Sequence, residues 1–268
     1  MVKLSISQTL SKAKSLEKKG EILEASRLYR RVLDIYPSNK RAQLSLAKLN
    51  NAYKNINIMT PPQNAINQVV NFYNQGNLVS VIEHSQKLII QYPKSFIIWN
   101  LLGAAYKGLG RIDEAADAFR EVVILNPQYA GGYSNLGTTF HEQGRLRDAL
   151  KVYEKAIALQ PDYAEAYSNM GNTFKELGKF KDAIESYNKA LLIEPNFADA
   201  YFNMGVVLNE QGNLHEALNA YNKALSFKSD YAEAYNNIGN TLRELENLPE
   251  AIEAYCKSLE FKPDYIEA

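Results

Sequence analysis

Four asparagines recur at a constant spacing and could hydrogen-bond a polypeptide backbone. They are Asn135, Asn169, Asn203 and Asn237, and the step from each to the next is the same. An asparagine amide carries both donors and an acceptor, so a column of such amides could clamp the backbone of an extended peptide. The alternative is that the amides hydrogen-bond inside the protein, locally or between neighbouring repeats.

Further polar residues share this period and complete the candidate site. With the four asparagines, we predict that they line a peptide-binding groove. The alternative for the charged members is a solvated helix surface with i,i+3 ion pairs such as Glu142–Arg145 and Glu176–Lys179. The predicted set is Asn172, Asn240, Glu142, Glu176, Glu210, Glu244, Lys107, His141, Lys175 and Arg243, and Glu165, Asp199 and Glu233 recur beside it.

Residues that commonly carry catalysis are sparse. His84, His141 and His215 occupy different places in the repeat, and none is spaced to share a metal ion with Cys256. No nucleophile elbow, phosphate loop or dinucleotide-binding glycine motif occurs. We therefore expect no enzyme activity, no cofactor and no metal site in these 268 residues.

The elements that must position these side chains are helices that recur with a period of about 34 residues. Glycine recurs at 103, 137, 171, 205 and 239, and alanine follows at the same later place in each unit. In the unit 164–197, Gly171 lies inside a first helix that Gly178 ends, because glycine readily adopts the left-handed conformation. A second helix carries Ala183 and Tyr187 at helical spacing. This period and pattern predict a solenoid of helix pairs.

Gly171 needs an explanation, because glycine costs a helix interior roughly 1 kcal/mol relative to alanine. We interpret it as a packing device that, together with Ala183, lets the two helices approach closely while Tyr187 and Phe174 fill the surrounding space. At about 100° per residue, Asn169 then lies on the face turned away from the second helix. We expect the groove on that face.

These residues resemble the tetratricopeptide repeat family. Matching units run over 96–129, 130–163, 164–197, 198–231 and 232–265, with an imperfect unit at 62–95 and a divergent one at 6–39. The segments YSNMGN, YSNLGT and YNNIGN are most similar to the arrays of O-linked N-acetylglucosamine transferases and related bacterial multi-repeat proteins. The resemblance implies an all-α, right-handed α-solenoid whose first helices line a protein-binding groove, and an asparagine ladder belongs to that transferase array.

One irregularity interrupts the array. Pro37 and Pro93 close their units, but the step between them exceeds one repeat by the segment at about 40–61. The excess suggests a single extra helix followed by a linker. We expect an N-terminal helical unit at 1–54, a linker or hinge at 55–61 and a regular array at 62–268.

The end of the sequence carries a second irregularity. Residues 265–268 repeat the entry to a further unit, so Ile252, Tyr255 and Leu259 of the last helix have no following repeat to cover them. An uncapped solenoid end exposes apolar surface. We expect a fragment of a longer protein, or an end that a partner or a second copy covers.

Composition and charge narrow the classes of partner. Apolar residues make up 46% of the chain, which indicates a folded protein. Thirty basic and thirty acidic residues cancel, so no net field favours nucleic acid or an anionic membrane. The sequence has neither a signal-peptide core nor an apolar stretch near the length of a membrane span. A single cysteine fits a reducing compartment, and we expect a cytoplasmic location.

Three functions are compatible with this reading. The first is a non-catalytic scaffold that binds an extended polypeptide of a protein partner in the concave groove. The second is the substrate-recruiting region of a larger transferase whose catalytic domain lies beyond residue 268. The third is a structural protein that forms homo-oligomers through its uncapped C-terminal repeat. A clamp for acidic chaperone tails is disfavoured, because the positions that carry basic residues in such clamps carry none here.

Overall fold

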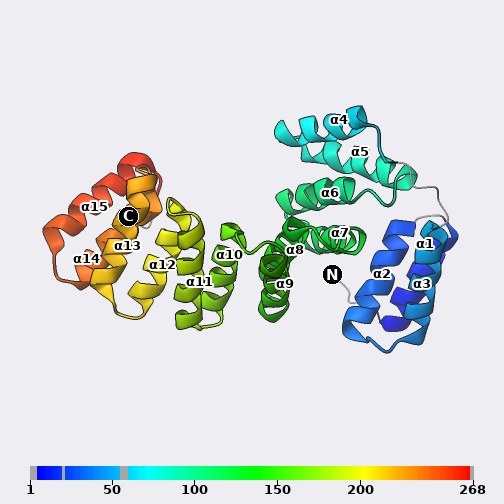
Figure 1. The fold of residues 1–268 in the computed structure, drawn as a ribbon, viewed down its shortest axis with the longest axis horizontal. Helices are drawn as coiled ribbons and strands as arrows, with labels where there is room; N and C mark the ends of the chain where they lie inside the picture. The colour runs from blue at the N-terminus through cyan, green and yellow to red at the C-terminus, as the bar shows by residue number, and fades with distance from the viewer. Residues whose placement is uncertain (1–4, 20–21, 55–59, 266–268) are drawn as a thin grey trace. The chain divides into compact units, whose positions relative to one another are not determined.

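All secondary structure in the described part of the chain is α-helical. The computed structural model describes residues 5–19, 22–54 and 60–265. Figure 1 shows the helices in chain order, and the predicted all-α fold is confirmed. The helices are α1 (Ile6–Lys18), α2 (Ile22–Ile35), α3 (Lys40–Lys54), α4 (Gln63–Asn74), α5 (Leu78–Gln91), α6 (Phe96–Gly108), α7 (Ile112–Leu125), α8 (Ala130–Glu142), α9 (Leu146–Leu159), α10 (Ala164–Glu176), α11 (Phe180–Ile193), α12 (Ala198–Glu210), α13 (Leu214–Phe227), α14 (Ala232–Glu244) and α15 (Leu248–Phe261).

The chain divides into two compact units, Met1–Ala105 and Tyr106–Ala268. In the first unit, α1 packs on α2 and α2 on α3, around a core that includes the buried Tyr29. The helix α3 follows the α1–α2 pair, and α4 and α5 form a pair of their own. The predicted hinge at 55–61 falls mostly outside the described residues. The boundaries expected around it stay a prediction.

Helices of the second unit stack in sequence order. From α7 to α15 each helix packs on the next, and the first helices of successive pairs also touch: α8 on α10, α10 on α12 and α12 on α14. The colour gradient of Figure 1 follows this order from α10 to α15. Such a stack is stabilised by contacts between neighbouring repeats, and it aligns equivalent residues of successive first helices.

Tyrosine rings occupy the space that a side chain at the repeated glycine would need. A Cβ atom added at Gly171 would lie 2.6 Å from Cε1 of Tyr187, and Tyr187 is fully buried. The same contact recurs at 2.5–2.6 Å between Gly137 and Tyr153, Gly205 and Tyr221, and Gly239 and Tyr255. The prediction that the glycine is a packing device is therefore confirmed.

In the α4–α5 pair, the larger side chain stands at the glycine position and the smaller one at the tyrosine position. Val69 stands at the glycine position and Ser85 at the tyrosine position, and both are fully buried. Among the described residues, the Ser85 hydroxyl has no hydrogen-bond partner. A buried hydroxyl without a partner is destabilising, because it loses its hydrogen bonds to water on folding.

We therefore expect Ser85→Ala to stabilise the protein by about 1 kcal/mol, since it removes the unpaired hydroxyl and leaves the packing nearly unchanged. Urea unfolding, followed by circular dichroism, measures the change. Ser186→Ala is the matched control, because the buried Ser186 hydroxyl donates a 2.8 Å hydrogen bond to the Asp182 carbonyl oxygen. Equal losses of stability in both variants would contradict the prediction.

The turn inside each helix pair requires a left-handed residue. Gly178 has φ +70° and follows the end of α10, as predicted, and Gly76, Gly110, Gly144 and Gly212 have φ between +69° and +76°. The α14–α15 turn instead uses Glu246, at φ +60°. A left-handed conformation costs a residue with a side chain roughly 1–2 kcal/mol.

Glu246→Gly should consequently raise the free energy of unfolding by about 0.5–1 kcal/mol, because the relief of strain exceeds the extra entropy that glycine gives the unfolded chain. Thermal unfolding of the variant measures this change. Glu250→Gly, in the first turn of α15, should lower stability. A Glu246→Gly variant that melts below the native protein would show that Glu246 is not strained.

The last helix leaves part of its apolar surface uncovered. Ile252 is 62% exposed and Leu259 is 38% exposed, as the sequence predicts. Tyr255 differs from the expectation: it is half-buried, and its hydroxyl donates a 2.9 Å hydrogen bond to Oδ1 of Asn240.

Candidate functional site

Tyrosine hydroxyl groups of the second helices hydrogen-bond to side chains of the first helices. The Tyr187 hydroxyl donates a 2.7 Å hydrogen bond to Oδ1 of Asn172, as Tyr255 does to Asn240. In the α8–α9 pair, Tyr153 makes a longer contact of 3.4 Å to the Thr138 hydroxyl. The amide oxygens of Asn172 and Asn240 therefore anchor the helix pair, which leaves their nitrogen atoms as the donors for the predicted groove.

The α12–α13 pair lacks this anchor, because Val206 replaces the asparagine. Burial raises the pKa of Tyr221, and the hydrogen-bonding amide of Asn237 partly offsets that rise. Asn237 belongs to the next helix pair, on α14. One member of the asparagine column therefore has a contact between neighbouring repeats, as the structural alternative for these residues expects.

Acidic residues of successive repeats converge on the same hydroxyl groups. Glu142 and Glu165 both raise the pKa of Tyr153 beyond the effect of its burial. Glu210 and Glu244 act in the same way on Tyr221. Each of these pairs of acids comes from two different first helices.

Two members of the asparagine column lack a contact of the kind that Asn237 makes. Asn169 on α10 and Asn203 on α12 are half-buried. Within the part of the chain that the structure describes, neither side chain makes a hydrogen bond. A half-buried amide of this kind is suited to an external ligand, because it is partly desolvated already. Asn135, on α8, is also half-buried.

Two basic residues of the predicted groove bridge successive helix pairs. Nζ of Lys107 lies 3.2 Å from Oε1 of Glu142, and Nε2 of His141 lies 3.1 Å from Oε1 of Glu176. The His141 contact has a short separation but not hydrogen-bond geometry. Such partly exposed pairs contribute little to stability. Lys175 is half-buried, and Glu210, Glu244 and Arg243 are exposed.

Among the described residues, the i,i+3 pairs considered from the sequence do not form for Glu142 and Glu176, whose carboxylates lie beside Lys107 and His141 instead. Arg145 pairs instead with Asp148 at 2.7 Å, and its guanidinium lies 4.3 Å from the Phe140 ring. The physical reason is that stacking brings the end of one first helix beside the end of the next. Sequence spacing along one helix cannot indicate that proximity.

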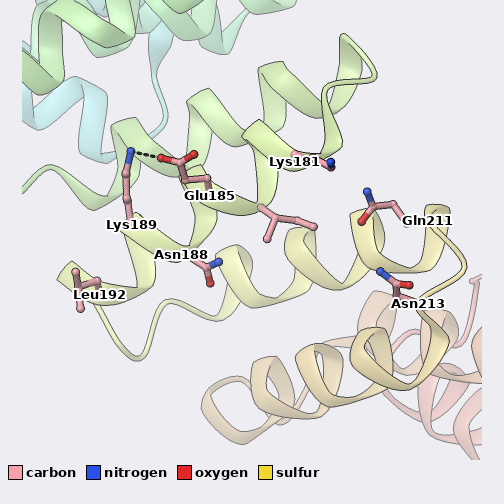
Figure 2. A pocket seen from close by; sticks show the side chains of 8 residues that line it. Lys181, Glu185, Asn188, Lys189, Leu192, Gln211 and Asn213 are labelled. Carbon is pink, nitrogen blue, oxygen red and sulfur yellow. Dashed lines mark hydrogen bonds and ion pairs between the residues drawn. The ribbon is translucent and has the colours of Figure 1, made fainter.

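Two further features were not predicted. The Asn209 amide donates a 2.9 Å hydrogen bond to the Thr241 hydroxyl, which links α12 to α14. An open depression of about 740 Å³ lies on the second helix α11 and the turn after α12, where Lys189 pairs with Glu185 at 2.7 Å (Figure 2). Its lining residues are Lys181, Ile184, Glu185, Asn188, Lys189, Leu192, Gln211 and Asn213.

The described ranges contain neither a metal centre nor a membrane-spanning helix. Among those residues, no three histidine, cysteine or acidic side chains are grouped to hold a metal ion. No described helix combines the length and the apolar character needed to cross a bilayer.

Family models match most of the second unit. A model described as TPR repeat matches residues 137–178 and 171–212, and models described as Tetratricopeptide repeat match 196–264 and 96–129. Together these matches cover more than half of the chain. No curated protein matches it.

Solved structures share the fold. The crystal structure of MamA is 27% identical, covers 62% of this chain and 98% of its own, and has a TM-score of 0.55. PilF of Pseudomonas aeruginosa is 17% identical, with coverages of 76% and 93% and a TM-score of 0.66. YrrB, described as a TPR protein with an unusual peptide-binding site, is 21% identical, with coverages of 68% and 94% and a TM-score of 0.52.

Proposed function

Because this chain belongs to the tetratricopeptide repeat family, we propose that it is a non-catalytic scaffold that binds an extended polypeptide along its first helices. The proposed site is the face of α8, α10, α12 and α14 that carries the asparagine column. The observation that carries the proposal is the pair of half-buried amides, Asn169 and Asn203, without hydrogen-bond partners among the described residues.

The geometry of the stack suits an extended ligand. Packed helices lie about 8–10 Å apart, and an extended chain advances about 3.3 Å per residue. One helix pair therefore corresponds to about three residues of a bound peptide. Asparagines at equivalent positions of successive first helices would meet the peptide backbone at regular intervals, and each offers donors and an acceptor.

A displayed library of random twelve-residue peptides tests the proposal. We expect the full chain to retain a subset of the peptides, and a synthetic copy of a retained peptide to slow hydrogen exchange of backbone amides in α10 and α12. Protection centred on α11 and the turn after α12, around Lys189 and Asn213, would place the ligand in the depression of Figure 2 and contradict the proposed site.

A further inference from the structure

The first helix α12 carries apolar side chains at two positions where its neighbours carry polar ones. At the position that Asn172 and Asn240 occupy in their repeats, α12 carries Val206. At the position of Ser168, it carries Phe202. Both apolar residues are half-buried, so each keeps some exposed surface, whereas Ser168 and Asn236, which are equivalent to Phe202, are buried.

An aromatic neighbour enlarges this surface and holds it in place. The ring centroids of Phe202 and Tyr231 are 4.7 Å apart, and that of Tyr221 is 5.8 Å from Phe202. Burial and the Asp199 carboxylate raise the pKa of Tyr231, and Nζ of Lys228 lies 3.9 Å from the centre of its ring. We call Phe202, Val206 and Tyr231 the apolar patch. Because the Phe202 and Tyr231 rings pack against each other, the patch exists before any ligand binds.

Exposed carboxylates lie on the two first helices that flank α12. Glu165 is in the first turn of α10 and Glu244 is the last residue of α14, and both are exposed. Glu210, on α12 itself, is exposed as well. Basic groups of a ligand that crosses α10, α12 and α14 would therefore be attracted by these carboxylates, and such an attraction between exposed groups weakens with salt.

We propose, on the basis of the function proposed above, that the apolar patch is a specificity site. Its ligand is an extended peptide with one apolar side chain between two basic residues, each three positions away. The apolar side chain is buried against Phe202, Val206 and Tyr231. The spacing of three follows from the distance between stacked helices and the rise of an extended chain.

Three labelled peptides test this inference by fluorescence anisotropy at low ionic strength. The first, SGRSGLSGRSG, has the proposed pattern, the second replaces leucine by serine, and the third replaces both arginines by glutamates. We expect the first peptide to bind the full chain about tenfold more tightly than the second, since burial of a leucine side chain is worth at least one decade in affinity. The third peptide should bind most weakly, and added salt should reduce the advantage of the first peptide over the third.

Variants of Val206 test whether the preference for leucine over serine depends on the apolar patch. Val206→Asn and Val206→Thr each install a residue that another repeat carries at this position, so the fold should be kept, and circular dichroism checks it. We expect both to reduce the preference for leucine over serine to about twofold or less. Leu192→Ser, which removes an 84% exposed leucine from α11, is the matched control and should leave the preference unchanged.

The outcomes separate the two proposals. Equal binding of the leucine and serine peptides to the native chain, or an unchanged preference in both Val206 variants, overturns the specificity site. In either case the proposed function stands if library peptides bind through Asn169 and Asn203. If neither library peptides nor these three peptides bind in a way that depends on the asparagines, both proposals are wrong.

Discussion

Replacing Gly171 by leucine should destabilise the second unit by about 1–3 kcal/mol or more, the range typical of an overpacked core. The reason is the Tyr187 ring, whose Cδ1, Cε1 and Cζ atoms all lie within 3.0 Å of the place that a Cβ would take. Even Gly171→Ala should lower stability, although alanine is the better helix former by about 1 kcal/mol. Thermal and urea unfolding measure both changes.

A double-mutant cycle identifies the contact responsible. The α4–α5 pair holds valine and serine at these two positions, so Gly171→Val combined with Tyr187→Ser copies an arrangement that the chain already uses. The double variant should be less destabilised than the sum of its single variants, because residues in contact couple. Additive losses, or a Gly171→Ala variant more stable than the native protein, would show that the glycine is not at a tight contact.

Replacing both Asn169 and Asn203 by alanine should weaken peptide binding about tenfold or more without destabilising the fold. Each lost hydrogen bond to a peptide backbone costs about 1 kcal/mol, and roughly 1.4 kcal/mol is one decade in affinity. Alanine also has the higher helix propensity, so stability should hold or rise slightly. Isothermal titration with a peptide retained from the library measures the affinity.

Lys155→Ala is the control for this variant, because Lys155 is exposed on the second helix α9. Asn237 is kept unchanged, since its amide contacts Tyr221 of the preceding repeat. A double variant that binds normally yet unfolds earlier would assign the two asparagines to contacts between repeats. The groove hypothesis would then be wrong for these positions.

Much of the fold could be predicted from the sequence, because each repeat contains its own contacts. The spacing of Gly171 and Tyr187 within a single repeat predicted a tight helix pair, and Gly178 predicted the end of α10. The exchange of sizes at Val69 and Ser85 could not be predicted in the same way. The repeat period places them at the glycine and tyrosine positions, but only the structure shows that both are buried.

The candidate site was less predictable, because its contacts join different repeats. The contact between Lys107 and Glu142 joins two neighbouring repeats and depends on how one first helix stacks on the next. The hydrogen bond from Tyr187 to Asn172 had a signal in the sequence, since both residues belong to one repeat. Asn172 was nevertheless predicted to lie in the groove, because only the helix face that carries it was considered. The depression on α11 had no sequence signal.

The repeated contact between glycine and tyrosine also bears on how such a chain can diversify. Gly205 and Tyr221 keep the contact at 2.6 Å in the repeat that carries Phe202 and Val206. The contact between glycine and tyrosine is therefore kept while other positions of the first helix change. A duplicated repeat could join the stack with its internal joint already formed, and its outward face could then change with little loss of stability. By this route an array can acquire new recognition one unit at a time.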